Sequence, residues 1–180
     1  EVISTEKLPG GSFRTRRKPR ESTRGVSLFR AQCSLSSVFP TDMNIQKDNE
    51  MYMRIALITA ERSYARRLKV GCVIVKNHSI ISFGWNGMPT GYDNCCEMEV
   101  DGKLVTRPEV PHAELNAIAK LAENGYSSKG AAIFITHSPC IHCALLIQKC
   151  GISQVFYHEL YRSDEGLRFL ERAGLEVHQL

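Results

Sequence analysis

The sequence predicts an α/β fold, a three-layer α/β/α sandwich in which helices cover both faces of a mixed sheet of about five strands. Two observations support this prediction: short β-rich runs alternate with helical patterns along most of the 180 residues, and the first two runs are only four residues apart. Runs that close together form an antiparallel hairpin, whereas strands separated by a helix pair in parallel through right-handed crossovers. The expected order of elements is therefore α-β-β-α-β-α-β-α-β.

The first half of this pattern begins with a helix and a hairpin. Apolar residues recur at helical spacing over residues 49–66, and the hairpin strands are expected over 71–75 and 80–84, joined by a four-residue loop. Glycines and prolines then interrupt regular structure, so a long loop is expected over residues 87–111. Loops of that length usually carry function.

The second half alternates helices with strands. Its first helix is expected to end at Asn124 and Gly125, a pair that is typical of a helix C-cap, and its second helix to stop at Gly151. The expected helices span residues 113–123, 140–150 and 164–173, and the expected strands span residues 131–136, 154–157 and 175–178.

Charge divides the chain into a basic tail and a neutral domain. Residues 1–42 carry eight of the 23 Lys and Arg residues but four of the 19 Asp and Glu residues, so residues 43–180 carry fifteen of each sign. The tail lacks a sustained apolar period, and we expect it to be disordered. Three origins are open for it: a basic arm for nucleic acid, a targeting segment, or sequence upstream of a natural start at Met43, which is the interpretation we favour.

Composition also narrows the class of function. A domain without net charge is poorly suited to binding long nucleic acids through their phosphates, which favours a small substrate. No stretch of the sequence approaches the ~18 consecutive apolar residues of a membrane span, so a soluble, cytoplasmic protein is expected. The seven cysteines are an odd number, and in a reducing compartment a close pair such as Cys140 and Cys143 more often forms a metal or redox site than a disulfide.

Two short motifs carry the chemistry, and each lies where a loop leads into an expected helix. They are Pro111-His112-Ala113-Glu114 and Pro139-Cys140-Ile141-His142-Cys143. A helix N-terminus lowers the pKa of a nearby thiol and favours the thiolate that zinc binds. One His and two Cys ligands leave the fourth tetrahedral position of zinc to water, which is typical of a catalytic site. We therefore predict one catalytic zinc ion held by His112, Cys140 and Cys143.

Glu114 is predicted to move the protons. Residues two apart on a helix point roughly 200° apart, so Glu114 is not expected to join His112 as a ligand. At the first turn of the helix it can reach past the metal, accept a proton from the activated water, and deliver it to a ring nitrogen and a leaving amine. The alternative is a redox motif or a closed structural zinc site, for which His137, His142 or Cys150 could supply the fourth ligand.

These motifs resemble those of the zinc-dependent cytidine and deoxycytidylate deaminase superfamily, whose signature is H-x-E followed by P-C-x-x-C. The resemblance covers residues 47–180 and implies a cytidine-deaminase-like fold, a catalytic zinc ion and the roles given above. Within the superfamily, the sequence is most similar to dCMP deaminases, through residues 70–75, 84–93 and 112–118. Family members usually have a small residue in place of Cys72 and Tyr in place of Trp85, and both departures are mild.

The resemblance implies a nucleotide substrate, dCMP, that is converted to dUMP for thymidylate synthesis. It implies that Asn86 contacts the deoxyribose or the base, and it makes Asn116, Arg66 and Tyr161 candidates for binding the 5′-phosphate. For the last three, the alternatives are a solvated helix position, a surface charge and a packed aromatic residue.

Regulation and assembly are implied as well. Many dCMP deaminases are hexamers activated by dCTP and inhibited by dTTP, and the loop over residues 86–93 resembles their nucleotide-sensing segment. Glycines in such a loop let backbone N–H groups approach phosphate oxygens, while an ordinary turn is the alternative. We expect a homo-oligomer, with a hexamer favoured, and the candidate allosteric residues are Asn86, Gly87, Gly91, Tyr92 and Asp93.

Cys95 and Cys96 are not assigned a metal. Some phage relatives hold a second, structural zinc ion with ligands from this loop, but the insertion that supplies those ligands is missing here, so one zinc ion is expected. Two other functions remain open: a deaminase of tRNA or another nucleobase on the same fold, and a structural zinc module that binds nucleic acid through the basic tail. No membrane partner is expected.

Overall fold

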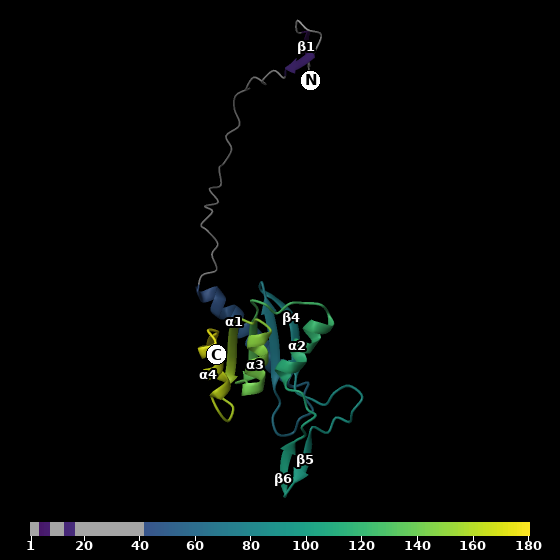
Figure 1. Cartoon of the computed structure of the whole chain (residues 1–180), viewed down its shortest axis with the longest axis vertical. Coiled ribbons are helices and arrows are strands. Elements are labelled where there is room, and N and C mark those ends of the chain that lie inside the picture. The colour runs from purple at the N-terminus through teal and green to yellow at the C-terminus, as the bar shows by residue number, and fades with distance from the viewer. Residues whose placement is uncertain (1–3, 8–12, 17–41) are drawn as a thin grey trace, which may run out of the picture. The chain divides into compact units, whose positions relative to one another are not determined.

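The computed structural model divides the chain into two compact units, Glu1–Val38 and Phe39–Leu180, and it describes residues 4–7, 13–16 and 42–180. In the first unit, β1 (Ser4–Lys7) pairs with the antiparallel strand β2 (Phe13–Arg16). The disorder predicted for residues 1–42 falls mostly outside the described residues and stays a prediction. The second unit, whose helices α1 to α4 are labelled in Figure 1, holds all the predicted site residues.

Four helices and seven strands make up the described part of the second unit. The helices are α1 (Asp42–Ala60), α2 (Ala113–Glu123), α3 (Ile141–Lys149) and α4 (Glu165–Arg172). The strands of the main sheet are β3 (Gly71–Lys76), β4 (Ser79–Trp85), β7 (Ala132–His137), β8 (Gln154–Glu159) and β9 (Glu176–Gln179). The other two, β5 (Glu97–Val100) and β6 (Lys103–Thr106), pair with each other.

The main sheet is mixed, with the strand order β4-β3-β7-β8-β9. β4 and β7 both pair with β3 in antiparallel fashion, whereas β8 pairs in parallel with β7 and with β9. The short β3–β4 connection produces the antiparallel hairpin, and α3 and α4 serve as crossovers between parallel neighbours. The predicted fold class and five-stranded mixed sheet are confirmed, and α1 to α4 and the strands of the main sheet follow the predicted order.

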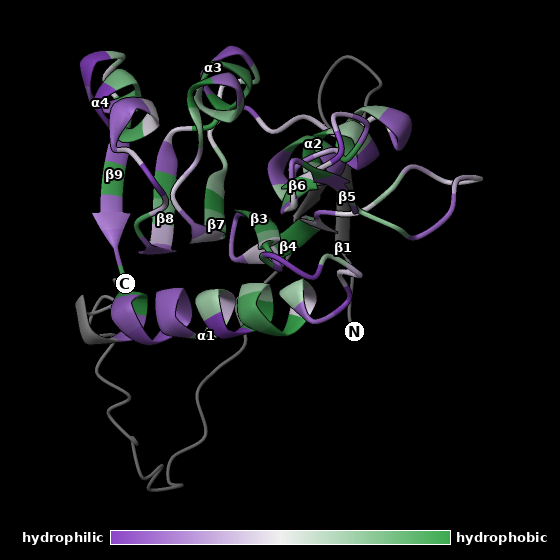
Figure 2. Ribbon diagram, turned by 90° about the horizontal axis from the view of Figure 1, so that it is seen from below, coloured by the Kyte–Doolittle hydropathy of each residue, from purple (hydrophilic) through white to green (hydrophobic). Residues whose placement is uncertain are grey.

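Helices cover both faces of this sheet, with α1 on one face and α2, α3 and α4 on the other (Figure 2). Side chains along β3 alternate between the two layers: Val73 and Val75 pack with α1, while Cys72 and Ile74 pack with the core on the opposite face. Because both of its faces are buried, β3 is apolar over nearly its whole length, as a central strand requires. Burial of each large apolar side chain in these layers stabilises the fold by about 1.5–3 kcal/mol.

The hairpin β5–β6 corrects the prediction of a loop without regular structure over residues 87–111. Asp101 and Gly102 connect its strands with positive φ angles of 50° and 69°, the geometry of a tight two-residue turn. Hydrophobic periodicity does not predict these strands, because the apolar side chains of β5, Met98 and Val100, are exposed and do not mark a face that packs on the core. An Asp-Gly pair is the sequence signal that predicts such a turn.

Several boundaries also differ from prediction, among them the start of α1 at Asp42, before the predicted residue 49. α1 ends at Ala60, before the predicted end at residue 66, and Ser63 beyond it donates a 2.6 Å hydrogen bond to the Asn86 carbonyl. The hairpin β3–β4 turns on two residues, Asn77 and His78, with φ angles of 50° and 58°, instead of on four. No helix in the described ranges is long and apolar enough to cross a membrane.

Candidate active site

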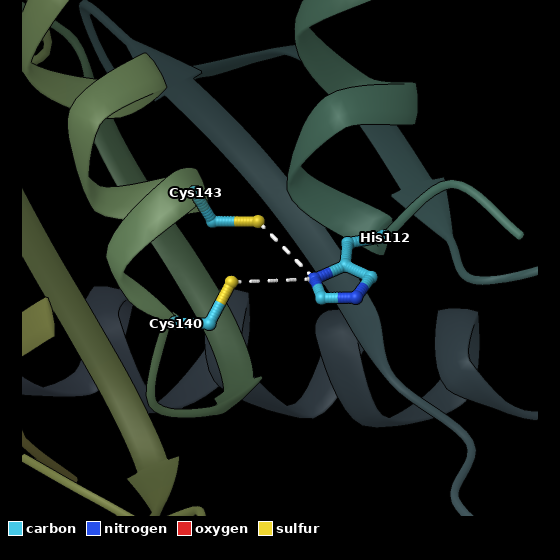
Figure 3. Close-up of side chains that lie close together, drawn as sticks. All are labelled: His112, Cys140 and Cys143. Carbon is cyan, nitrogen blue, oxygen red and sulfur yellow. Dashed lines mark hydrogen bonds between the residues drawn. The ribbon is translucent and has the colours of Figure 1, made fainter. Parts of the chain in front are cut away.

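The predicted zinc ligands lie at the starts of two helices. His112 is the N-cap residue of α2 and Cys140 is the N-cap residue of α3, both with extended backbone angles, and Cys143 follows in the first turn of α3. Unpaired N–H groups at such helix starts favour negative charge on the two sulfur atoms. Figure 3 shows both cysteine side chains directed at one nitrogen of the His112 ring.

The distances among these three side chains suit one tetrahedral ion. The Nδ1 atom of His112 lies 3.6 Å from the Sγ atom of Cys140 and 3.3 Å from that of Cys143, and the three ligand atoms all lie within 4.8 Å of one another. Zinc bonds of ~2.0–2.3 Å in tetrahedral geometry place ligand atoms roughly 3.5 Å apart. One imidazole and two thiols at this spacing fit a zinc ion with one position left for water.

The ionisation of the two cysteines is coupled. Hydrogen bonds from the Cys143 thiol and from the His112 imidazole lower the pKa of Cys140 to about 3. The hydrogen bond to Cys140, together with burial, raises the pKa of Cys143, and the hydrogen bond to Cys140 also raises the pKa of His112. The Cys140 thiolate is therefore stabilised by two hydrogen bonds, one from the Cys143 thiol and one from the protonated His112 ring. A divalent cation that replaced these two protons would hold both cysteines as thiolates.

Glu114 lies in the first turn of α2, and only 3% of its surface is exposed. Burial raises the pKa of its carboxyl group, while its own backbone N–H and the nearby His112 partly offset that effect. A carboxyl group with a raised pKa exchanges its proton more readily near neutral pH, as general acid-base catalysis requires. Glu114 lines the same cavity as His112 and Cys140.

That cavity has a volume of about 470 Å³, which is in the range of small-molecule binding sites. One part of its wall contains Glu114 and two of the three ligand residues, His112 and Cys140. Two arginines in the rest of the wall make the cavity suitable for an anionic small molecule. The other lining residues include Arg67, Asn86, Thr106, Ser138, Tyr161 and Arg162.

Two of the predicted substrate-binding residues, Asn86 and Tyr161, line this cavity. The Asn86 side chain accepts a 2.8 Å hydrogen bond from the Val70 N–H and donates one of 2.9 Å to the Leu68 carbonyl. The amide therefore fixes the backbone that leads into β3, and it keeps one lone pair and one N–H for a ligand.

The other two predicted residues, Asn116 and Arg66, do not line the cavity. The Asn116 side chain donates a 2.7 Å hydrogen bond to the Trp85 carbonyl, which ties α2 to the end of β4. The backbone N–H of Arg66 donates to a carboxylate oxygen of Glu97 at 2.9 Å. Their role in phosphate binding stays a prediction, and this cavity gives it no support.

Sequence reasoning missed the two arginines that do line the cavity, Arg67 and Arg162. The guanidinium of Arg67 donates a 3.0 Å hydrogen bond to the Oγ1 atom of Thr106, and that of Arg162 lies 4.8 Å from the centre of the Tyr161 ring. Each directly follows a residue that the sequence did single out, Arg66 or Tyr161. Only the fold shows which neighbour faces the cavity.

Of the five residues of the predicted allosteric loop, only Asn86 lines the cavity. Asp93 forms an ion pair with Arg107, with 3.2 Å between Oδ1 and Nη1, and Gly91 has a φ angle of 93°, which favours glycine. Tyr92 is 61% exposed. Gly91, Tyr92 and Asp93 are therefore exposed and do not line the cavity, and the role of this loop in nucleotide sensing stays a prediction.

A closed structural zinc site would need a fourth protein ligand, and the described residues place none beside the other three. In the part of the chain that the structure describes, the metal-binding group contains His112, Cys140 and Cys143 and no other residue. The His137 ring is engaged elsewhere, with its Nε2 atom 3.3 Å from a carboxylate oxygen of Glu159.

Gly166 sets how closely α4 packs on the second zinc motif. A Cβ atom at this position would overlap the carbonyl oxygen of Pro139 and lie 3.1 Å from the carbonyl carbon of Cys140. Carbon atoms in unstrained packing stay ~3.5–4.0 Å apart. Glycine thus lets α4 lie directly against the backbone that positions Cys140.

An α/β/α sandwich that holds one His and two Cys at two helix starts, with a buried Glu in the same cavity, defines a class: the zinc-dependent deaminases. Sequence comparison narrows it, because the cytidine and deoxycytidylate deaminase zinc-binding region matches residues 46–159, which include the three ligands and Glu114. The chain belongs to the cytidine and deoxycytidylate deaminase family. Zinc is the metal of this family's site, and the donor set found here fits it.

Individual relatives agree with this assignment. ComE operon protein 2 of Bacillus subtilis is 35% identical, with 73% of this chain and 70% of the relative covered. The deoxycytidylate deaminase of Enterobacteria phage T4 is 33% identical, with 69% of this chain and 86% of the relative covered. The crystal structure of the dCMP deaminase from cyanophage S-TIM5, in complex with dCMP and dUMP, matches with a TM-score of 0.71 and 42% identity over 74% of this chain and 97% of that chain.

Proposed function

We propose that this chain hydrolyses dCMP to dUMP and ammonia. The observation that carries the proposal is the convergence of the three ligands beside the buried Glu114, in a cavity whose wall also contains Arg67 and Arg162. The metal site suits hydrolysis of a ring amino group, and the arginines suit the phosphate of a nucleotide. Similarity to the T4 deoxycytidylate deaminase and to the S-TIM5 dCMP deaminase supports this choice of substrate.

His112, Cys140 and Cys143 hold the metal, and Glu114 moves the protons. When bound, zinc supplies the Lewis acidity that makes water a nucleophile near neutral pH. The oxygen of this water bonds to C4 of the cytosine ring, and the bond from C4 to the amino nitrogen breaks. Glu114 accepts the protons that the water gives up, delivers one to the N3 atom of the ring and one to the departing amine, and so releases ammonia.

We assign the phosphate of the substrate to the part of the cavity wall that contains Arg67 and Arg162. Arg67 and Arg162 bind the phosphate, in place of the Arg66 and Asn116 suggested by sequence, because a guanidinium can donate two parallel hydrogen bonds to phosphate oxygens. Asn86 contacts the sugar or the base with the hydrogen-bonding capacity that its backbone contacts leave free. Tyr161 lies beside Arg162 at the phosphate end.

The proposal extends to the assembly of the chain and to its regulation by nucleotides. Residues 43–180 form the catalytic domain of a cytoplasmic hexamer, with residues 1–42 as a separate basic tail, and the dUMP produced supplies thymidylate synthesis. dCTP activates and dTTP inhibits through the loop over residues 86–93, whose exposure leaves it open to a second nucleotide. Turnover measured with and without each effector, and the molecular mass in solution, test these points.

Turnover of dCMP by the zinc-loaded chain, followed by loss of cytosine absorbance, tests the activity itself. Glu114→Gln should retain zinc and lower kcat by about 10³-fold, because an amide cannot carry the proton. The matched variant Cys140→Ala should lose both zinc and turnover. The proposal is wrong if Glu114→Gln turns over at the wild-type rate, or if the wild-type chain leaves dCMP unchanged with and without dCTP. Deamination of tRNA but not of dCMP would favour the nucleobase alternative.

A further inference from the structure

Glu97 is the first residue of β5 and is only 5% exposed, although the rest of β5 lies on the surface. A buried carboxylate is costly unless hydrogen bonds replace its lost water. Here the Oε1 atom of Glu97 accepts hydrogen bonds from two successive backbone N–H groups, that of Arg66 at 2.9 Å and that of Arg67 at 3.1 Å. These hydrogen bonds therefore connect the start of the β5–β6 hairpin to the backbone of Arg66 and Arg67, about 30 residues earlier in the chain.

The other carboxylate oxygen of Glu97, Oε2, is buried and has no hydrogen-bond partner among the described residues. A single oxygen therefore makes all the contacts of this side chain to the Arg66–Arg67 backbone. An amide also has one acceptor oxygen and can reproduce these contacts, whereas a methyl group cannot. This difference makes Glu97→Gln a conservative variant and Glu97→Ala a disruptive one.

The residue opposite Glu97 in the hairpin completes the attachment. Thr106 pairs with Glu97 in the register of β5 and β6, and its Oγ1 atom accepts a 3.0 Å hydrogen bond from Nη1 of Arg67. Both Thr106 and Arg67 line the cavity. One cross-strand pair thus holds the backbone of Arg67 on one side and its guanidinium on the other.

We propose that Glu97 and Thr106 are positioning residues, which hold the guanidinium of Arg67 ready for the substrate phosphate and so give the site its preference for a nucleotide over a nucleoside. The inference rests on the proposed function, because it takes Arg67 as a phosphate ligand. A free arginine on the surface samples many rotamers and loses that freedom when it binds an anion. Fixing the guanidinium beforehand removes this loss and strengthens phosphate binding without any new contact.

Beyond its base, the hairpin has little apolar packing to attach it to the domain. A two-stranded hairpin alone is marginally stable in water, and three of its apolar side chains, those of Met98, Val100 and Leu104, remain 42% to 43% exposed. At its base, Cys96 packs in a buried apolar cluster with Ala65 and Val110. The contacts of Glu97 and Thr106 are those that reach Arg67 in the cavity wall.

Steady-state kinetics with dCMP and with deoxycytidine, which lacks the phosphate, test the inference. Glu97→Ala should raise the KM for dCMP about tenfold and leave kcat within about twofold, because Arg67 loses its anchor while the metal site is untouched. For deoxycytidine, kcat/KM should stay within about twofold, because that substrate does not use Arg67. Glu97→Gln should return the KM for dCMP to within about threefold of wild type, and Thr106→Val should raise it about threefold.

Glu99→Ala is the matched control, because it removes an exposed carboxylate from the same strand and should change neither substrate's kinetics. Zinc content and thermal unfolding, measured for each variant, show whether the domain is intact. If Glu97→Ala does not fold, Thr106→Val decides, since it exchanges one hydroxyl for a methyl group. An unchanged KM for dCMP in the folded variants, or equal losses for the two substrates, would overturn the inference. Failure of the wild-type chain on dCMP would overturn the proposed function instead.

Discussion

The cavity has two walls of different construction. The metal wall (His112, Glu114 and Cys140) lies at the starts of α2 and α3, which pack on the main sheet. Its Glu114 is only 3% exposed, and the third ligand residue, Cys143 in the first turn of α3, is 5% exposed. The hairpin wall (Arg67, Val105 and Thr106) stands on a two-stranded sheet and an adjoining loop, with Val105 38% exposed. Packing thus fixes the atoms to which we assign the chemistry, while a few polar contacts fix the part of the wall that we assign to the phosphate.

Because the two walls are held by different contacts, a substitution can impair the function of one wall and leave that of the other intact. A defect in the metal wall should affect every substrate alike, because each of them needs the activated water. A defect in the hairpin wall should affect only substrates that carry a phosphate. Comparing dCMP with deoxycytidine therefore separates the two walls experimentally.

Among variants that keep the cavity-lining residues, the largest effect is expected at Gly166, which supports the metal wall from α4. Gly166→Ala should weaken zinc affinity by about 10- to 100-fold, because the added methyl group displaces the backbone around Cys140. Competition with a chelator measures the affinity, and turnover of dCMP and of deoxycytidine should fall together at limiting zinc.

Gly71→Ala provides the control for this prediction. Its Cβ atom would come 2.5 Å from the backbone nitrogen of Ala60 in α1, on the sheet face away from α3. It should lower the free energy of unfolding by about 1–3 kcal/mol and leave zinc affinity unchanged. Equal zinc affinities for the Gly166→Ala and Gly71→Ala proteins would show that α4 does not position Cys140.

A smaller, substrate-dependent effect is expected at Arg67, in the hairpin wall. Arg67→Gln should raise the KM for dCMP about 30-fold, because a charge-assisted contact to phosphate contributes ~2 kcal/mol, and it should leave deoxycytidine turnover unchanged. Arg66→Gln is the comparison, since Arg66 does not line the cavity. A larger effect for Arg66→Gln than for Arg67→Gln would restore the assignment made from sequence.

The smallest effect is expected at the tip of the hairpin. Gly102 has a φ angle of 69°, and a side chain in that conformation costs ~1 kcal/mol. Gly102→Ala should therefore speed amide hydrogen exchange in β5 and β6 about fivefold, with zinc content and deoxycytidine turnover unchanged. Lys103→Ala, at the neighbouring exposed position, should not alter exchange. Unaltered exchange in Gly102→Ala would mean that the hairpin opens only with the whole domain.

The two walls also differ in how much of them the sequence predicts. The metal wall was predicted residue by residue, because its members lie within two short motifs at helix starts, where local sequence and chemistry agree. The order of helices and strands followed from periodicity for the same reason. The hairpin wall was missed because its defining contact joins Glu97 to backbone atoms about 30 residues away, and nothing local marks it. Arg66 and Arg67 have the same chemistry, and the hydrogen bond from the Arg67 guanidinium to Thr106 distinguishes the one that lines the cavity.

The close packing of Gly166 on Pro139 has a consequence for the interpretation of genetic variants. A chain could keep His112, Glu114, Cys140 and Cys143 intact, carry any larger residue at position 166, and still be scored as active by a motif search. The overlap at Gly166 indicates that such a chain would hold its metal poorly. A search for active members of this family should therefore weigh position 166 together with the four motif residues, because a Cβ atom there overlaps the carbonyl oxygen of Pro139.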